Sequence, residues 1–231
     1  MKGAGYRIFT LIFGKVSVKL VRTENHAVQI RAGPESTEII SRTEESKMSK
    51  VFVFLADGFE EIEGLTVVDI LRRAQIETET VSVTGKKEVH GSHGITVFAD
   101  KLFEEISGED AALLVLPGGM PGTLHLGAHQ GLAELLKKAV SDGKKVAAIC
   151  AAPSVLGELG LLKGQRAVCY PGFEEKLLGA ETGTEPVAVS GNITTSRGMG
   201  TAIPFALSLA AQLKDQKTAD AIGEGIIWDV H

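Results

Sequence analysis

Residues 50–74, KVFVFLADGFEEIEGLTVVDILRRA, indicate the fold class. The run 50–56 is almost continuously apolar and has the length of a strand, as expected for a strand buried on both faces. Asp57-Gly58 then favours a turn, and apolar residues recur at helical spacing over residues 60–74. The segment therefore predicts a strand, a turn and a helix, which is the first half of a βαβ unit.

The rest of the chain repeats this alternation. Short apolar runs predict strands over residues 78–84, 95–99, 111–116 and 145–149. Helical spacing predicts helices over residues 130–141, 152–159, 200–213 and 219–226, with one helical turn over 174–178. Gly191-Asn192 predicts a hairpin between strands 187–189 and 193–195. Together these elements predict one α/β domain over residues 48–231, with a doubly wound, mostly parallel sheet and helices on both faces.

Composition excludes several classes of protein. The 231 residues are 44% hydrophobic and 23% charged, which excludes intrinsic disorder over most of the chain. No apolar run approaches the ~18 residues of a membrane span, and the net charge of -5, without a strong Lys/Arg cluster, argues against nucleic acid as the main partner. Two cysteines, Cys150 and Cys169, exclude a disulfide scaffold and favour a reducing compartment, so we expect a cytoplasmic protein.

Residues 1–47 differ from the rest of the chain. They carry eight Lys or Arg and five Glu, a net charge of +3, which leaves a net charge of -8 for the other residues. A short apolar run makes a secretory signal the poorest interpretation, while an organellar presequence and a leader or over-long start before Met48 remain open. We favour the leader and expect this extension to be disordered, although residues 16–21 and 27–30 have the pattern of short strands.

Cys150 stands where a predicted buried strand meets a predicted helix, in the sequence ICAAP. Pro153 is favoured in a first helical turn, so Cys150 is expected on a sharp elbow above the positive end of that helix. A helix N-terminus lowers the pKa of a thiol, and the thiolate is the nucleophile. On position alone, a reactive cysteine and a buried structural cysteine both remain open.

Carboxylates follow the first predicted strand, in the sequence DGFEEIE of residues 57–63. Glu60 and Glu61 are explained as complements of the helix dipole. Glu63 lies one turn beyond Glu60, and a carboxyl pressed against a thiol in an apolar cleft would have a raised pKa and could move a proton. Glu63 is therefore a candidate acid and base.

Glycines follow the strand predicted over residues 111–116. In Pro117-Gly118-Gly119 the two glycines permit positive φ and let backbone N–H groups point at a ligand, as in an oxyanion hole. No nucleotide-binding glycine motif occurs, and His125 and His129 have no third ligand nearby in the sequence, so we expect neither a cofactor nor a metal.

Residues 48–231 resemble the ThiJ/PfpI superfamily, and most closely its DJ-one branch. Four motifs in order carry the resemblance, which are ADGFEEIE (56–63), VLPGG (115–119), AAICAAP (147–153) and TSRGMGTAIPFAL (195–207). The resemblance implies a flavodoxin-like fold, a homodimer and chemistry without a cofactor. It further implies that Cys150 is an oxidation-sensitive nucleophile, that a protonated Glu63 donates to its sulfur, and that Gly118, Gly119 and Ala151 supply backbone N–H groups.

Two activities follow from this resemblance. Members are credited with glyoxalase activity, which converts methylglyoxal to lactate, and with deglycation of early glyoxal adducts on proteins and nucleotides. The alternative is an oxidative-stress sensor or redox-regulated chaperone, in which Cys150 is oxidised to a sulfinate without turnover. Ala151 stands where many cysteine hydrolases of this architecture have a histidine, which argues against a protease.

Tyr170 departs from the family pattern. It precedes Pro171, where relatives often have a histidine near the nucleophile. A phenol does not exchange protons at neutral pH as an imidazole does, but it can donate a hydrogen bond to a bound carbonyl. We therefore expect Tyr170 to contact the substrate and Glu63 to be the acid and base.

Overall fold

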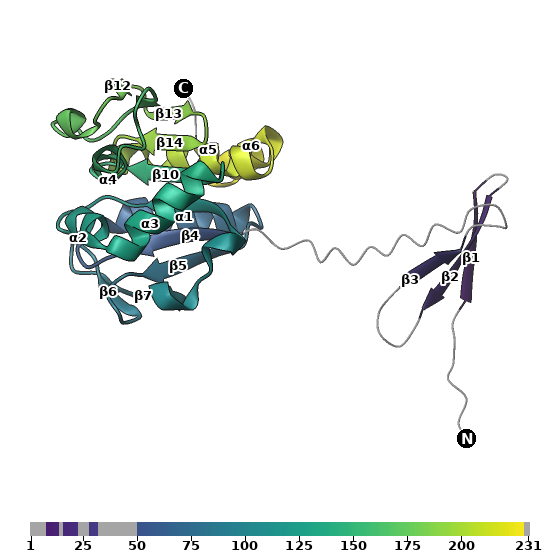
Figure 1. Cartoon of the computed structure of the whole chain (residues 1–231). Coiled ribbons are helices and arrows are strands. Elements are labelled where there is room, and N and C mark those ends of the chain that lie inside the picture. Colours follow the sequence, from purple (N-terminus) through teal and green to yellow (C-terminus); the bar gives the residue numbers. More distant parts are fainter. Residues whose placement is uncertain (1–7, 14–15, 23–27, 32–49, 229–231) are drawn as a thin grey trace. The chain divides into compact units, whose positions relative to one another are not determined.

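The computed structural model describes residues 8–13, 16–22, 28–31 and 50–228 (Figure 1). The chain divides into two compact units between residues 46 and 47, and each is described by itself. The predicted boundary at Met48 lies outside the described residues.

The first unit contains a three-stranded antiparallel sheet. Its strands, in the order β1-β2-β3, are β1 (Ile8–Phe13), β2 (Val16–Arg22) and β3 (Val28–Arg31). Strands β2 and β3 lie where the sequence pattern predicted them, so these described residues are strands where we expected disorder. That this segment is a leader stays a prediction.

A seven-stranded sheet is the centre of the second unit. Its strands run across the sheet in the order β13-β14-β10-β9-β4-β5-β8. Their bounds are β4 (Lys50–Leu55), β5 (Thr78–Ser82), β8 (Lys101–Leu102), β9 (Ala111–Leu116), β10 (Lys145–Ile149), β13 (Val187–Ser190) and β14 (Ile193–Ser196). Every neighbouring pair is parallel except β13 and β14, which form the predicted hairpin. The prediction of a mostly parallel sheet is confirmed.

Helices cover both faces of this sheet. On one face the apolar side chains pack with those of α1 (Glu61–Arg73), α5 (Ala202–Leu213) and α6 (Gln216–Gly225). On the other face they pack with those of α2 (Gly122–Ala128), α3 (Gln130–Ser141) and α4 (Pro153–Glu158). Short pieces complete the unit, namely β6 (Glu88–His90), β7 (Thr96–Phe98), β11 (Arg166–Ala167), β12 (Glu181–Thr182) and four single 3-10 turns at Phe103–Glu105, Gly108–Asp110, Glu174–Lys176 and Met199–Thr201.

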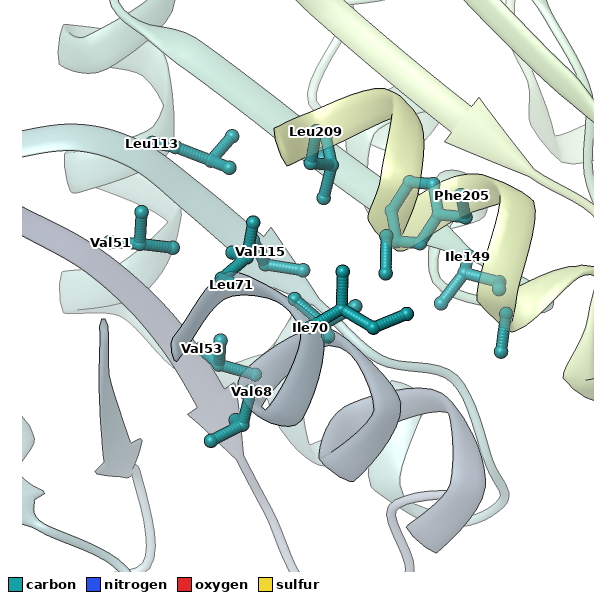
Figure 2. Packing of buried hydrophobic residues seen from close by; sticks show 14 of the residues in the cluster. Val51, Val53, Val68, Ile70, Leu71, Leu113, Val115, Ile149, Phe205 and Leu209 are labelled. Atoms are coloured by element: carbon teal, nitrogen blue, oxygen red, sulfur yellow. The ribbon is translucent and has the colours of Figure 1, made fainter. Parts of the chain in front are cut away.

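Strand β4 shows why its sequence is apolar throughout. Val51, Val53 and Leu55 belong to the core on the α1 and α5 face. Figure 2 shows Val51 and Val53 in this core together with Phe205 of α5. Phe52 and Phe54 point to the opposite core, because successive side chains of a strand alternate between faces. Both faces are covered, so neither set of side chains is left in water.

The order of the strands across the sheet reverses between two central strands, β4 and β9. The parallel strands β4, β5, β9, β10 and β14 follow one another in the chain, but across the sheet they run β5-β4-β9-β10-β14. The next parallel strand after β4 in the chain, β5, lies on one side of β4, and the later strand β9 lies on its other side. In open α/β sheets of this order, ligands bind outside the carboxyl ends of the strands where the order reverses. That place here is the end of β4 and β9.

Among the described residues, no helix is both long enough and apolar enough to cross a membrane.

Candidate active site

Cys150 lies on the predicted elbow, directly after β10. Its φ of +64° is in the left-handed region, which a residue with a Cβ seldom adopts. Two hydrogen bonds hold the elbow: the Cys150 N–H donates to the Ser196 carbonyl over 3.0 Å, and the Tyr170 N–H donates to the Cys150 carbonyl over 2.8 Å. The strain indicates a backbone shaped to present this side chain.

Glu63 is the nearest acid to this cysteine. It lies in the first turn of α1, and only 1% of its surface is exposed. Its side chain is hydrogen-bonded to the Cys150 thiol, and its Oε2 accepts a 2.9 Å hydrogen bond from the Gly118 N–H. Burial raises the pKa of Glu63 to about 7, with the charge of Glu60 acting in the same direction and the two hydrogen bonds opposing them. The raised pKa expected from the sequence is therefore found.

The pKa of the Cys150 thiol differs from the one expected from the sequence. Burial, followed by the charge of Glu63 and the hydrogen bond to it, raises the pKa of Cys150 to about 12, although the N–H groups of Ala151 and Gly119 donate to the sulfur and act in the opposite direction. The lowered thiol pKa predicted from the helix N-terminus was wrong. Helix α4 has only six residues, and burial of the sulfur, together with the adjacent Glu63 carboxylate, outweighs the effect of its dipole.

These two shifts describe a pair that holds a single proton near neutral pH. Between pH values near 7 and near 12 the pair holds one proton and one negative charge, and the lower pKa of Glu63 places that charge mainly on its carboxylate and the proton on Cys150. The Gly118 N–H favours the charge on Glu63, whereas the Ala151 and Gly119 N–H groups favour it on Cys150. The site can therefore present a thiolate beside a carboxylic acid.

The two glycines after β9 leave no room for a side chain. A Cβ on Gly118 would lie 2.6 Å from the Cys150 Cβ and 2.7 Å from Glu63 Oε2. Gly119 has a φ of +90°, and a Cβ there would overlap the Glu60 backbone nitrogen. The sequence singled out both glycines for their N–H groups. Gly119 donates to the sulfur, but Gly118 donates to Glu63.

Tyr170 lies at the rim of the site, and half of its surface is exposed. Its backbone N–H holds the elbow, and its ring lies beside Gly198. A Cβ on Gly198 would be 3.4 Å from the Tyr170 ring and 4.0 Å from Glu63 Oε1. The structure thus brings Cys150, Glu63, Gly119, Ala151 and Tyr170 to one place.

Sequence reasoning missed a neighbour of this site, His93. Its Nδ1 lies 3.1 Å from Glu61 Oε2 and 3.3 Å from Glu60 Oε2, and its backbone N–H donates to Glu61 Oε1 over 2.8 Å. These are also the side chains that best match a metal-ligand set among the described residues, but their donor and acceptor atoms already bind one another. Glu61, which we explained by the helix dipole, holds the turn that carries His93.

The chain is similar to known proteins over most of its length. The model of the DJ-1/PfpI family matches residues 49–212. Protein DJ-1 homolog B of Arabidopsis thaliana is 37% identical over 216 residues, which cover 90% of this chain, and the chain spans about half of that relative, 49%. A protein of Pyrococcus abyssi named a deglycase is 35% identical over 156 residues, covering 65% of this chain and 91% of the relative. The solved structure of oxidised Toxoplasma gondii DJ-1 has a TM-score of 0.75 and 39% identity, covering 78% of this chain and 98% of that one.

Proposed function

This chain belongs to the DJ-1/PfpI family, and from that membership and the paired Cys150 and Glu63 we propose that it is a cysteine-dependent glyoxalase and deglycase. Its substrates are methylglyoxal, glyoxal and their early adducts on proteins and nucleotides, and no cofactor takes part. One observation carries the proposal: an acid with a pKa of about 7 is hydrogen-bonded to a nucleophile on a strained elbow. The relative named a deglycase supports the substrate class.

The first step is addition of sulfur to the aldehyde. With the shared proton on Glu63, the Cys150 thiolate attacks the aldehyde carbon of methylglyoxal, and the carbonyl electron pair moves to oxygen. The Ala151 and Gly119 N–H groups, which hydrogen-bond the sulfur, lie close enough to stabilise that oxygen as it gains charge. Glu63 then gives its proton to the oxygen, which leaves a hemithioacetal and a carboxylate.

The second step moves a proton between two carbons. The Glu63 carboxylate takes the proton from the former aldehyde carbon and returns it to the neighbouring carbon, through an enediol. In the same exchange the hydroxyl proton on the former aldehyde oxygen passes to the former ketone oxygen, so the first carbon becomes the carbonyl of a thioester. The product is a thioester of lactate on Cys150, and Glu63 is a carboxylate again. Water then hydrolyses the thioester, which releases lactate and restores the thiol with one proton on the pair. Tyr170 donates a hydrogen bond to the second carbonyl of the substrate.

For an early adduct the same nucleophile acts on the carbon that links the glyoxal group to the protein or nucleotide. The Cys150 sulfur forms a bond to that carbon as its C–N or C–S bond breaks, and the free amine or thiol leaves with the proton that Glu63 supplies. The resulting hemithioacetal then passes through the second step to a thioester, which water hydrolyses. Tyr170, half exposed at the rim, suits a site that admits groups larger than free methylglyoxal.

A sensor is the second candidate function, and the same acid favours it. Two equivalents of peroxide convert a thiol to a sulfinic acid and two water molecules, and a protonated Glu63 would donate a hydrogen bond to a sulfinate oxygen. The oxidised relative from Toxoplasma gondii is consistent with such chemistry in the family. In this reading Cys150 reacts with an oxidant and turns over no aldehyde.

Turnover of methylglyoxal by the purified full chain separates these candidates. Wild type should form lactate, and Cys150→Ser and Glu63→Gln should form none above background. Cys169→Ser, which changes the second free cysteine, a buried one, should retain activity. Lactate formation that survives Cys150→Ser would overturn the proposal. If wild type forms no lactate and mild peroxide adds two oxygen atoms at Cys150, the sensor is the better account. The cytoplasmic location and the homodimer stay predictions.

A further inference from the structure

His93 lies in a turn that packs on the start of α1, far from Cys150 in the sequence. Its ring is 70% exposed, yet Nδ1 lies within 3.3 Å of oxygens of both Glu60 and Glu61. Ser92 Oγ donates to the same two carboxylates over 3.2 and 3.3 Å. Two acids and one imidazole therefore share a small volume, so a cationic imidazole is favoured over a neutral one.

Glu60 connects this cluster to the candidate active site. Its backbone N–H donates to the Gly118 carbonyl over 2.9 Å, and the N–H of the same Gly118 donates to Glu63. The side chain of Glu60 is 13% exposed, and its negative charge raises the pKa of Glu63. A cation that offsets the charge of Glu60 therefore lowers the pKa of Glu63.

We propose that His93 is a positioning residue that sets, through Glu60, the pH at which the Cys150–Glu63 pair releases its first proton. A cationic His93 offsets the charge of Glu60, and the pair then loses a proton more readily. When His93 becomes neutral, the full charge of Glu60 acts on Glu63, and the pair holds its proton more tightly. The use of this effect in turnover rests on the proposed function.

Few charged groups face His93 and Glu63. For His93 they are Glu61 and Glu60 on α1 and the loop before it, and their hydrogen bond and charge raise the pKa of His93. For Glu63 they are Cys150 after β10 and Glu60. Among the described residues, no Lys or Arg shifts the pKa of either group, so His93 is the cation that can answer Glu60.

Coupling of this kind changes the shape of a titration. As the pH rises, His93 loses its proton later than a free imidazole does, because the hydrogen bond to Glu61 and the charge of Glu60 raise the pKa of His93. Once His93 is neutral, the charge of Glu60 resists the loss of the proton that the Cys150–Glu63 pair still holds. The first proton of the pair should leave over a wider pH range than a single independent acid allows. The site would keep its acid form further into the alkaline range than a fixed cation at position 93 permits.

Alkylation of Cys150 by iodoacetamide as a function of pH tests this without requiring turnover. The rate is measured by mass in wild type, His93→Arg, His93→Gln and the control His90→Gln, a surface histidine that pairs with Glu88 instead. The midpoint of the first rise should fall by roughly half a pH unit in His93→Arg and rise by a similar amount in His93→Gln, since a direct neighbour shifts a pKa by about 1–3 units and this action is indirect. The rise in wild type and in His90→Gln should be equally broad, and broader than in the two His93 variants.

Glu60→Gln decides between an electrostatic and a merely structural role. Alone, Glu60→Gln should lower the pH midpoint of alkylation. Combined with His93→Arg or His93→Gln in double variants, it should remove the difference between their midpoints. Midpoints that move in the same direction in both His93 variants, or do not move at all, would overturn the inference. If wild type makes no lactate but the opposed shifts appear, the proposed function fails and the inference stands.

Discussion

Replacing Glu63 by glutamine should stabilise the protein, and more so as the pH rises. Glutamine keeps an oxygen to accept from the Gly118 N–H but carries no charge, so it removes the unfavourable burial of a carboxylate. The folded protein holds a proton on Glu63 up to about pH 7, whereas an unfolded chain releases it near the usual 4.5. The contribution of protonated Glu63 to the free energy of unfolding is therefore complete below pH 4.5 and is lost as the pH rises through 7.

The magnitude follows from that difference. Each pH unit between the two pKa values is equivalent to about 1.4 kcal/mol. Wild type should lose about 1 kcal/mol at pH 5 and about 3 kcal/mol at pH 8, relative to fully protonated Glu63. The gain in Glu63→Gln over wild type should grow by about 2 kcal/mol between these two pH values.

Chemical denaturation of the full chain, followed by the helical circular-dichroism signal, measures this gain at both pH values. Glu134→Gln, which changes an exposed residue of α3, is the matched control and should show the same small effect at each pH. The reasoning would be refuted by a difference between Glu63→Gln and wild type that is the same at pH 5 and pH 8. It would also be refuted by a loss of stability in Glu63→Gln that grows with pH.

Three further changes test other parts of the structure. Gly118→Ala places a methyl group against Cys150 and Glu63, so lactate formation should fall by more than about tenfold in the assay for the proposed function. Burial alone would raise the pKa of Glu61, but hydrogen bonds from its own backbone N–H and from His93 lower it to about 2. Glu61→Gln should therefore lower the free energy of unfolding by about 1–3 kcal/mol near neutral pH. In acid denaturation curves this difference should shrink as the pH falls through about 2. Phe205→Ala empties a fully buried position on α5 and should cost about 3–5 kcal/mol by denaturant unfolding, with unchanged activity per folded molecule.

Much of the fold could be predicted because its strands are buried on both faces. The runs that become β4, β9 and β10 are continuously apolar, and little else in a globular protein has that pattern at that length. Helix α2 was missed, since its sequence GTLHLGA is short, has two glycines and lacks a clear apolar stripe. His129, which the sequence analysis considered only as a metal ligand, accepts a 3.0 Å hydrogen bond from the Leu132 N–H at the start of α3.

The sequence singled out the residues of the candidate site and the raised pKa of Glu63, but it predicted the wrong direction for the pKa of Cys150. A strand end predicts that Cys150 is presented, and the spacing of DGFEEIE separates Glu63 from Glu60 and Glu61. The depth of burial and the direct contact of acid and thiol arise only when β4, β9 and β10 are adjacent, and these set both pKa values. His93 lies some 30 residues from the acids that it meets, and nothing local in its sequence marks that contact.

The left-handed backbone at Cys150 has a consequence for how this chain could be improved by selection or by design. Position 150 favours glycine on conformational grounds, and a residue with a Cβ there lowers stability by about 1 kcal/mol or more. A screen for thermal resistance alone would accept glycine at this position and would discard the nucleophile. A screen for chemistry would keep the cysteine and tolerate the weaker fold. At Cys150 the two selections oppose each other, so compensating stability has to come from elsewhere in the molecule.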